Sequence, residues 1–157
     1  MFLKYRGFAL SLDVAVVIVC ISLLLLIGLI GFQSYVKSAK INKAKADTAT
    51  LALAVAQYAY DMENVYPDYT AAQCLPNNLV ALESQKAGKG PWLSGNTIKK
   101  SGTSYLDPWG NAYIYTYGSG NDGRFVVYSK GPNGNGTVSI IGVASSDGIG
   151  ASGGFSK

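Results

Sequence analysis

An uninterrupted apolar run from Val14 to Phe32 constrains this chain more than any other feature. As a helix rising about 1.5 Å per residue it would be roughly 28 Å long, close to the ~30 Å hydrocarbon core of a bilayer. A carboxylate, Asp13, stands immediately before the run. Because an ionised Asp costs about 2.5 to 3.5 kcal/mol at a bilayer centre, Asp13 either escapes to the headgroups or is kept to meet another protein group. The run therefore predicts one membrane-spanning helix and leaves both interpretations of Asp13 open.

Helical periodicity continues after the apolar run, with no proline before Pro67. Apolar or small residues recur every three or four positions and form one stripe: Ile41, Ala44, Thr48, Leu51, Val55, Tyr58 and Met62. Asp47 is expected mostly off this stripe. The pattern predicts a single helix from about residue 9 to about 62, apolar on all sides in its first half and amphipathic in its second. Gly28 and Gly31 either bend this helix locally or allow another helix to pack closely.

The rest of the chain changes to a strand pattern. Residues 112–117, 124–129 and 137–143 are β-rich runs separated by the turn sequences "GSGNDG" and "KGPNGNG". They predict a three-stranded antiparallel meander whose apolar face is covered by the amphipathic half of the helix, an α+β fold. Tyr113, Tyr115 and Tyr117 share one face of the first strand.

The segments around this meander are expected to be less regular. "YPDY" ends the long helix, "PNNLVALES" forms a short amphipathic turn, and "KAGKGPW" and "NTIKKSGTS" are loops. The Gly/Ser-rich tail "ASSDGIGASGGFSK" is expected to be loosely held.

Composition argues against an enzyme. The chain has no histidine, and its nine acidic residues form no cluster at ligand spacing. The net charge of +4 comes from scattered lysines, with the densest group at Lys37, Lys40, Lys43 and Lys45. Cys20 lies in the membrane run and Cys74 far from it in sequence, so no disulfide within the chain is expected.

Four stretches together resemble the type IV pilin and type II secretion pseudopilin superfamily, nearest to the major pseudopilin. They are the basic junction "RGFALSLD", the continuous helix, its "VYPD" ending, and "GPWL" followed by "YLDPWGNAYIY". The resemblance implies a prepilin leader over 1–7, cut between Gly7 and Phe8, and N-methylation of Phe8. It further implies a transmembrane and assembly half over 8–34 and an exported pilin-like domain over 35–157.

In this superfamily an early acid attracts the N-terminal amine of a neighbouring subunit during assembly, in an apolar setting where the attraction is weakly screened. Asp13 would take that part. Family members usually place a glutamate fifth after the cut, whereas Asp13 is sixth, and one residue is about 100° of helix rotation.

"DPWG" also has a purely physical interpretation. Asp107, Pro108 and Gly110 occupy the first, second and fourth positions that a type I turn prefers. Trp109 is interpreted as a packing anchor, and the motif as structural.

The major pseudopilins hold calcium in a loop near the C terminus. Here "GPNGNGTVSI" offers Asn133 and Asn135 but no carboxylate, and Asp147 is the only acid nearby. Because Ca²⁺ prefers several charged oxygens, we predict no metal site and no cofactor.

The resemblance implies a structural subunit of a pseudopilus that drives type II protein secretion. The subunit would be stored in the inner membrane as a single-pass protein, with its C-terminal domain exported, and then assembled into a helical filament. Its partners would be copies of itself, minor pseudopilins, the inner-membrane assembly platform and the prepilin peptidase. Lys and Arg are fewer before the apolar run than after it, which argues for the opposite orientation; the leader junction outweighs that count.

Two alternatives stay open beside the pseudopilus. A type IV pilus subunit for adhesion, motility or DNA uptake uses the same helix physics. A DNA-binding module would use Lys37–Lys45 and the tyrosines, but these lysines would be buried in a filament, so nucleic acid is the less favoured partner.

Overall fold

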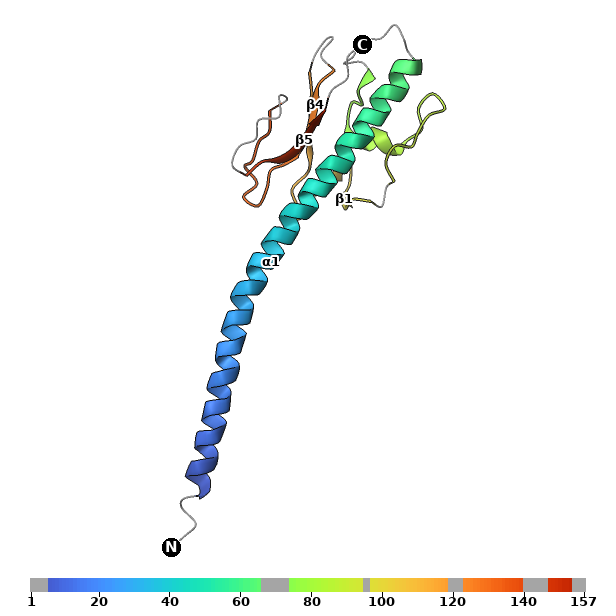
Figure 1. Ribbon diagram of the computed structural model, residues 1–157. Coiled ribbons are helices and arrows are strands. Elements are labelled where there is room, and N and C mark those ends of the chain that lie inside the picture. The colour runs from blue at the N-terminus through green and yellow to red at the C-terminus, as the bar shows by residue number, and fades with distance from the viewer. Residues whose placement is uncertain (1–5, 66–73, 95–96, 119–122, 140–146, 154–157) are drawn as a thin grey trace. The chain divides into compact units, whose positions relative to one another are not determined.

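One long helix dominates the structure. The computed structural model describes residues 6–65, 74–94, 97–118, 123–139 and 147–153. Helix α1 runs over Arg6–Val65 and is unbroken at Gly28 and Gly31 (Figure 1). It ends just before the Tyr-Pro pair at 66–67, because a proline disfavours helical backbone in the residue that precedes it. The predicted helix is confirmed and is a few residues longer at each end.

The chain divides into two units, Met1–Ala39 and Lys40–Lys157. The second unit contains the end of α1, a 3₁₀ helix and five strands: η2 (Leu79–Glu83), β1 (Lys100–Ser101), β2 (Ser104–Tyr105), β3 (Ile114–Tyr117), β4 (Phe125–Ser129) and β5 (Ile149–Gly153). The strands form an antiparallel pair, β1-β2, and an antiparallel sheet in the order β3-β4-β5. The predicted α+β architecture, with a three-stranded antiparallel sheet on the C-terminal half of the helix, is confirmed.

Between the helix and the sheet, the described residues contain more regular secondary structure than the sequence suggested. Asn78 begins η2, and its side chain accepts a hydrogen bond from the N–H of Ala81 over 3.0 Å, as a helix cap does. This agrees with the short amphipathic turn expected there. The prediction that "NTIKKSGTS" is only a loop was wrong, because Lys100 pairs with Tyr105 and Ser101 with Ser104.

The third strand of the sheet was predicted in the wrong place. Of residues 137–143, the structure describes 137–139, which hold only an isolated bridge at Val138. The strand that pairs with β4 is β5, from the tail that was expected to be loosely held. The glycines of β5 explain why the sequence did not predict this strand, because glycine is not typical of strands. A Cβ on Gly150 would lie 2.8 Å from the Tyr128 Cβ, so β5 packs where larger residues do not fit.

The predicted apolar stripe of α1 forms one wall of the core. Ala44, Leu51, Val55, Tyr58 and Met62 are all buried. They pack with residues of the sheet and of the intervening segment, among them Leu82, Tyr105, Phe125 and Val127. Asp47, expected off the stripe, is buried as well.

Candidate functional site

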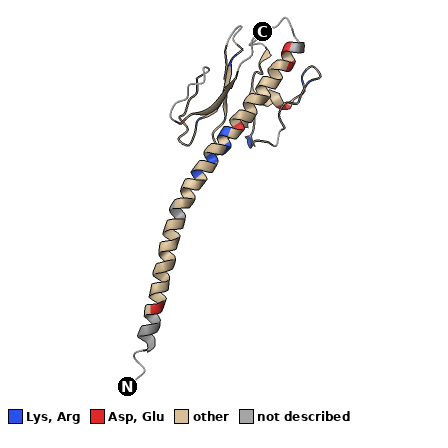
Figure 2. Ribbon diagram, viewed as in Figure 1, with Lys and Arg blue, Asp and Glu red and all other residues tan. Residues whose placement is uncertain are grey.

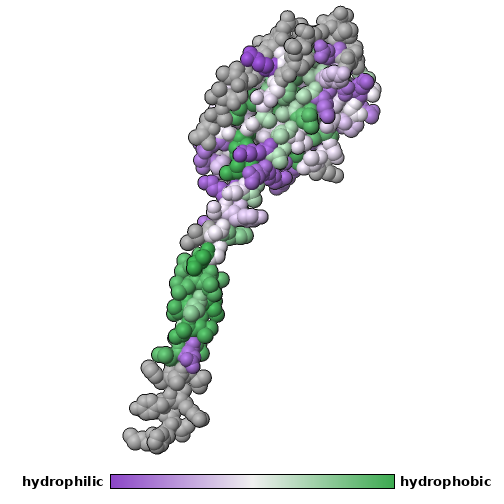
Figure 3. All heavy atoms as spheres, viewed as in Figure 1, coloured by the Kyte–Doolittle hydropathy of each residue, from purple (hydrophilic) through white to green (hydrophobic). Residues whose placement is uncertain are grey.

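The first half of α1 presents apolar side chains on every side. Of its large apolar residues from Leu12 to Phe32, those whose side chains are described are between 52% and 71% exposed in the single chain, and Figure 3 shows them as a green band. Within the described residues, α1 is the one helix long and apolar enough to cross a membrane, by length and composition. Side chains of this kind need a covering, which lipid or other apolar helices can supply.

The residues predicted for processing and assembly lie at the start of this helix. Gly7 and Phe8 are in the first turn of the α1 backbone, and the side chain of Phe8 lies outside the described part of the chain. Asp13 is exposed, and no ion pair to it occurs among the described residues. Cleavage after Gly7, methylation of Phe8 and the assembly role of Asp13 therefore stay predictions.

The Asp107–Gly110 motif lies in a closed turn. The N–H of Gly110 donates to the carbonyl of Asp107 over 3.0 Å, and Gly110 has a φ of +93°, which glycine adopts without strain. The buried carboxylate of Asp107 accepts from the backbone N–H of Trp109 at 3.0 Å and of Asn111 at 2.8 Å. Its other oxygen accepts from Ser129 Oγ at 2.6 Å. The turn is thereby fastened to the end of β4.

A buried contact that the sequence did not predict ties the helix to the sheet. The hydroxyl of Tyr113 donates to Asp47 Oδ2 over 3.0 Å, and Lys43 lies 3.6 Å from the other oxygen of that carboxylate. Burial first, and then the charge of Asp47, raise the pKa of Tyr113, so its hydroxyl keeps the proton that it donates. One signal was available: Asp47 is three residues after Ala44 and four before Leu51, on the buried face.

A second set of contacts fastens the segment "KAGKGPW" to the same helix. Trp92 Nε1 donates to Asp61 Oδ2 over 2.7 Å, and the Trp92 ring meets Tyr58 edge-on with centroids 4.6 Å apart. Lys86 Nζ donates to the Tyr58 hydroxyl over 2.9 Å. These contacts join residues about thirty positions apart, so no local sequence pattern predicts them.

Glu83, at the end of η2, receives two donors from the β1-β2 pair. Lys100 Nζ lies 2.6 Å from one of its oxygens, and the hydroxyl of Tyr105 donates to the other. The hydrogen bond from Lys100, followed by the one from Tyr105, lowers the pKa of Glu83. Glu83 therefore stays ionised and holds the pair against η2.

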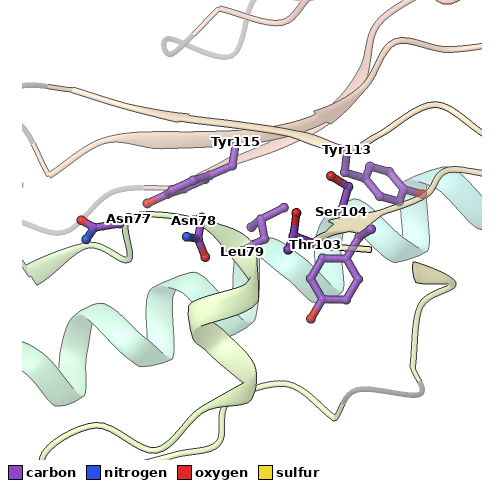
Figure 4. Close-up of a pocket in the computed structure, with 8 residues that line it drawn as sticks. Asn77, Asn78, Leu79, Thr103, Ser104, Tyr113 and Tyr115 are labelled. Atoms are coloured by element: carbon purple, nitrogen blue, oxygen red, sulfur yellow. The ribbon is translucent and has the colours of Figure 1, made fainter. Parts of the chain in front are cut away.

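A cavity of about 200 Å³ lies between η2, the β1-β2 turn and β3 (Figure 4). It is lined by residues 77–79 and 103–105 and by Tyr113 and Tyr115, none of which is charged at neutral pH. Burial raises the pKa of Tyr115, whose buried hydroxyl has no hydrogen-bond partner among the described residues. This lining offers polar contacts but no acid and base pair for catalysis.

The loop that would hold calcium in the major pseudopilins closes through direct contacts here. Asn133 Nδ2 donates to Asp147 Oδ2 over 2.7 Å. A Cβ on Gly131, which has a φ of +74°, would lie 2.1 Å from the carbonyl oxygen of Asp147, so the two ends of the loop touch. In the described part of the chain, no three His, Cys, Asp or Glu residues lie close enough together to hold a metal ion. With one carboxylate already engaged, this donor set does not fit Ca²⁺.

Among the described residues, neither Cys20, which is exposed, nor Cys74, which is buried, is in a disulfide.

Comparison with protein families matches residues 32–140 to type II secretion system (T2SS), protein G. The chain belongs to the type II secretion system protein G family. Members of this family are pseudopilins, so the superfamily inferred from the sequence motifs is confirmed. The match spans η2, both strands of the β1-β2 pair, β3 and β4, and it begins where the apolar run ends. Comparisons with curated proteins and with solved structures give no match.

Proposed function

We propose that this protein G family pseudopilin is a structural subunit of the pseudopilus, stored in the inner membrane through residues 8–34 with the domain over 35–157 exported. The family match over residues 32–140 is the observation that carries the proposal. The apolar half of α1 supports membrane storage, because none of its described side chains is buried within the chain itself. In the filament, copies of the chain would assemble with minor pseudopilins on an inner-membrane platform.

Processing by a prepilin peptidase is the first step of this function. We expect cleavage between Gly7 and Phe8 and methylation of the new N-terminal amine of Phe8. Intact-mass measurement of the chain purified from membranes tests this, and a mass lower by residues 1–7 and higher by one methyl group is expected. Recovery of only the full-length chain from cells with an active peptidase would contradict it.

Asp13 is proposed to pair with that N-terminal amine on a neighbouring subunit. Asp13→Asn should leave processing and membrane abundance unchanged, because the amide is easier to bury than the carboxylate. Filament yield should fall sharply, since the amine would then be buried without a counter-charge, a loss of several kcal/mol. Asp13→Glu should retain part of the yield.

The measurement is crosslinked oligomer yield at equal membrane abundance. Glu63→Gln, which removes one acid near the other end of the same helix, is the matched control and should assemble normally. Undiminished assembly of the Asn variant would return Asp13 to the role of an interfacial acid.

The family match favours a secretion pseudopilus over a surface pilus subunit. A strain lacking this protein should lose export of type II substrates and recover it with the wild-type chain. Normal export together with loss of surface filaments would instead identify a pilus subunit.

A further inference from the structure

We propose that two lysines of α1, Lys37 and Lys40, bind the anionic phosphate headgroups of the bilayer that holds the apolar half of the helix. We call them the juxtamembrane lysines. The inference rests on the membrane storage proposed above and adds a lipid partner to it.

Their position along the helix is the first argument. Phe32, the last residue of the apolar run, is 65% exposed, and Tyr35 is 73% exposed. Tyrosine is enriched at the interface between hydrocarbon and headgroups, which places that interface near Tyr35. Lys37 follows Phe32 by five residues, or roughly 8 Å of helix, which is within the headgroup region of about 5 to 8 Å once the reach of its side chain is included. Lys40 follows within one further turn.

Their charge is the second argument. All four lysines from Lys37 to Lys45 are exposed, and Figure 2 shows them as a blue group on α1. Of these four lysines, only Lys43 has an acid within reach among the described residues, Asp47 at 3.6 Å. That carboxylate is buried and also accepts the hydroxyl of Tyr113. The juxtamembrane lysines thus have no counter-charge in the described part of their own chain.

The sequence before them supplies none either. No acid occurs between Asp13 and Asp47, a stretch that includes the whole apolar run. Lipid phosphates are the nearest anions for lysines placed just beyond a membrane span. Each lysine near an anionic surface favours binding by roughly fivefold, and the attraction decays over a Debye length of about 8 Å in physiological salt.

The test uses the full chain in nanodiscs that contain phosphatidylcholine and phosphatidylglycerol. Native mass spectrometry of the released chain counts the lipids that remain bound. The wild-type chain should retain phosphatidylglycerol over phosphatidylcholine by fivefold or more at about 50 mM salt and much less at about 500 mM. The double variant K37Q/K40Q should lose this preference.

Two controls separate lipid binding from net charge. The variant K89Q/K99Q removes the same charge from the domain and should keep the wild-type preference. Lys43→Gln should also keep most of it, because Lys43 is paired with Asp47. A loss as large in the domain variant would mean that net charge alone selects the lipid and would overturn the proposal.

Insertion into the disc without a preference for phosphatidylglycerol would overturn the lipid site and leave the proposed pseudopilin function standing. The same holds if the double variant keeps its lipid preference but loses oligomers, because the lysines would then meet acids of a second copy. Failure of the chain to insert at all would overturn membrane storage as well.

Discussion

The hydroxyl of Tyr113 and the carboxylate of Asp47 meet over 3.0 Å, although the two residues are 66 positions apart. Asp47 is 8% exposed and Tyr113 is 6% exposed, so water can replace neither partner readily. The contact joins the buried face of α1 to the residue that precedes β3. In a domain whose sheet has three short strands, one such contact helps to set where the sheet docks on the helix.

Tyr113→Phe should therefore destabilise the chain. The ring stays in place, but Asp47 is left buried with one donor fewer, at a cost of about 1 to 3 kcal/mol. Urea unfolding in mild detergent measures the change, and Tyr117→Phe, at a 40% exposed site, should be near neutral. If the Asp47 contact is the cause, the double variant Tyr113→Phe with Asp47→Asn should lose less unfolding free energy than the sum of the losses in the two single variants.

Gly150 should not tolerate a side chain. A Cβ there would lie 2.8 Å from the Tyr128 Cβ and 2.9 Å from the Val127 carbonyl oxygen. Gly150→Ala should cost about 1 to 3 kcal/mol, because β5 must move away from β4 to make room. The exposed neighbour Ser152→Ala is the control, expected within about 0.5 kcal/mol of wild type. An unchanged unfolding midpoint in the Gly150 variant would argue against β5 as the third strand.

Acid should weaken the attachment of the β1-β2 pair to η2. The pKa of Glu83 is lowered from its ordinary value of 4.5, chiefly by Lys100 and next by Tyr105. A folded pKa below the unfolded one gives stability that is present above about pH 4.5 and is lost as the pH falls through the folded value. The melting temperature of wild type should exceed that of Glu83→Gln at pH 7, and the difference should shrink below pH 4.5.

Lys100→Gln removes the other partner of the Glu83–Lys100 ion pair. Its melting temperature should also lie below that of wild type at pH 7, and this difference should shrink below pH 4.5. If the difference in melting temperature between wild type and Glu83→Gln stays constant down to pH 3, the lower stability of the variant is explained by packing and not by charge.

Calcium removal should leave the chain intact. The loop from Gly131 to Asp147 is closed by the Asn133 amide and by direct backbone contact. A chelator should therefore not lower the melting temperature of the purified chain, whereas a ligand that bound the folded state would raise it on addition. A clear fall on chelation would show that carbonyl oxygens and Asp147 bind the ion together.

Local sequence determined the parts of this protein whose physics is local. The apolar run, the stripe from Ala44 to Met62 and the helix stop before Pro67 depend on residues a few positions apart, which share one helix face or one turn. The same holds for β3 and β4, whose β-branched and aromatic residues are close in sequence and pair with one another. The turn over Asp107–Gly110 could also be predicted from the sequence, because it depends on residues only one to three positions apart.

Tertiary structure decided which surfaces meet. "IGASG" has no strand signal of its own, and it becomes β5 because glycines alone fit beside Tyr128 and Phe125. From the sequence alone, an acid at position 47 is expected to face solvent. In the fold it is buried, because the hydroxyl of Tyr113, 66 residues away, donates a hydrogen bond to it. Burial of a polar group is unfavourable without its partner and acceptable with it, and that partner is specified by the packed fold and not by the neighbouring sequence.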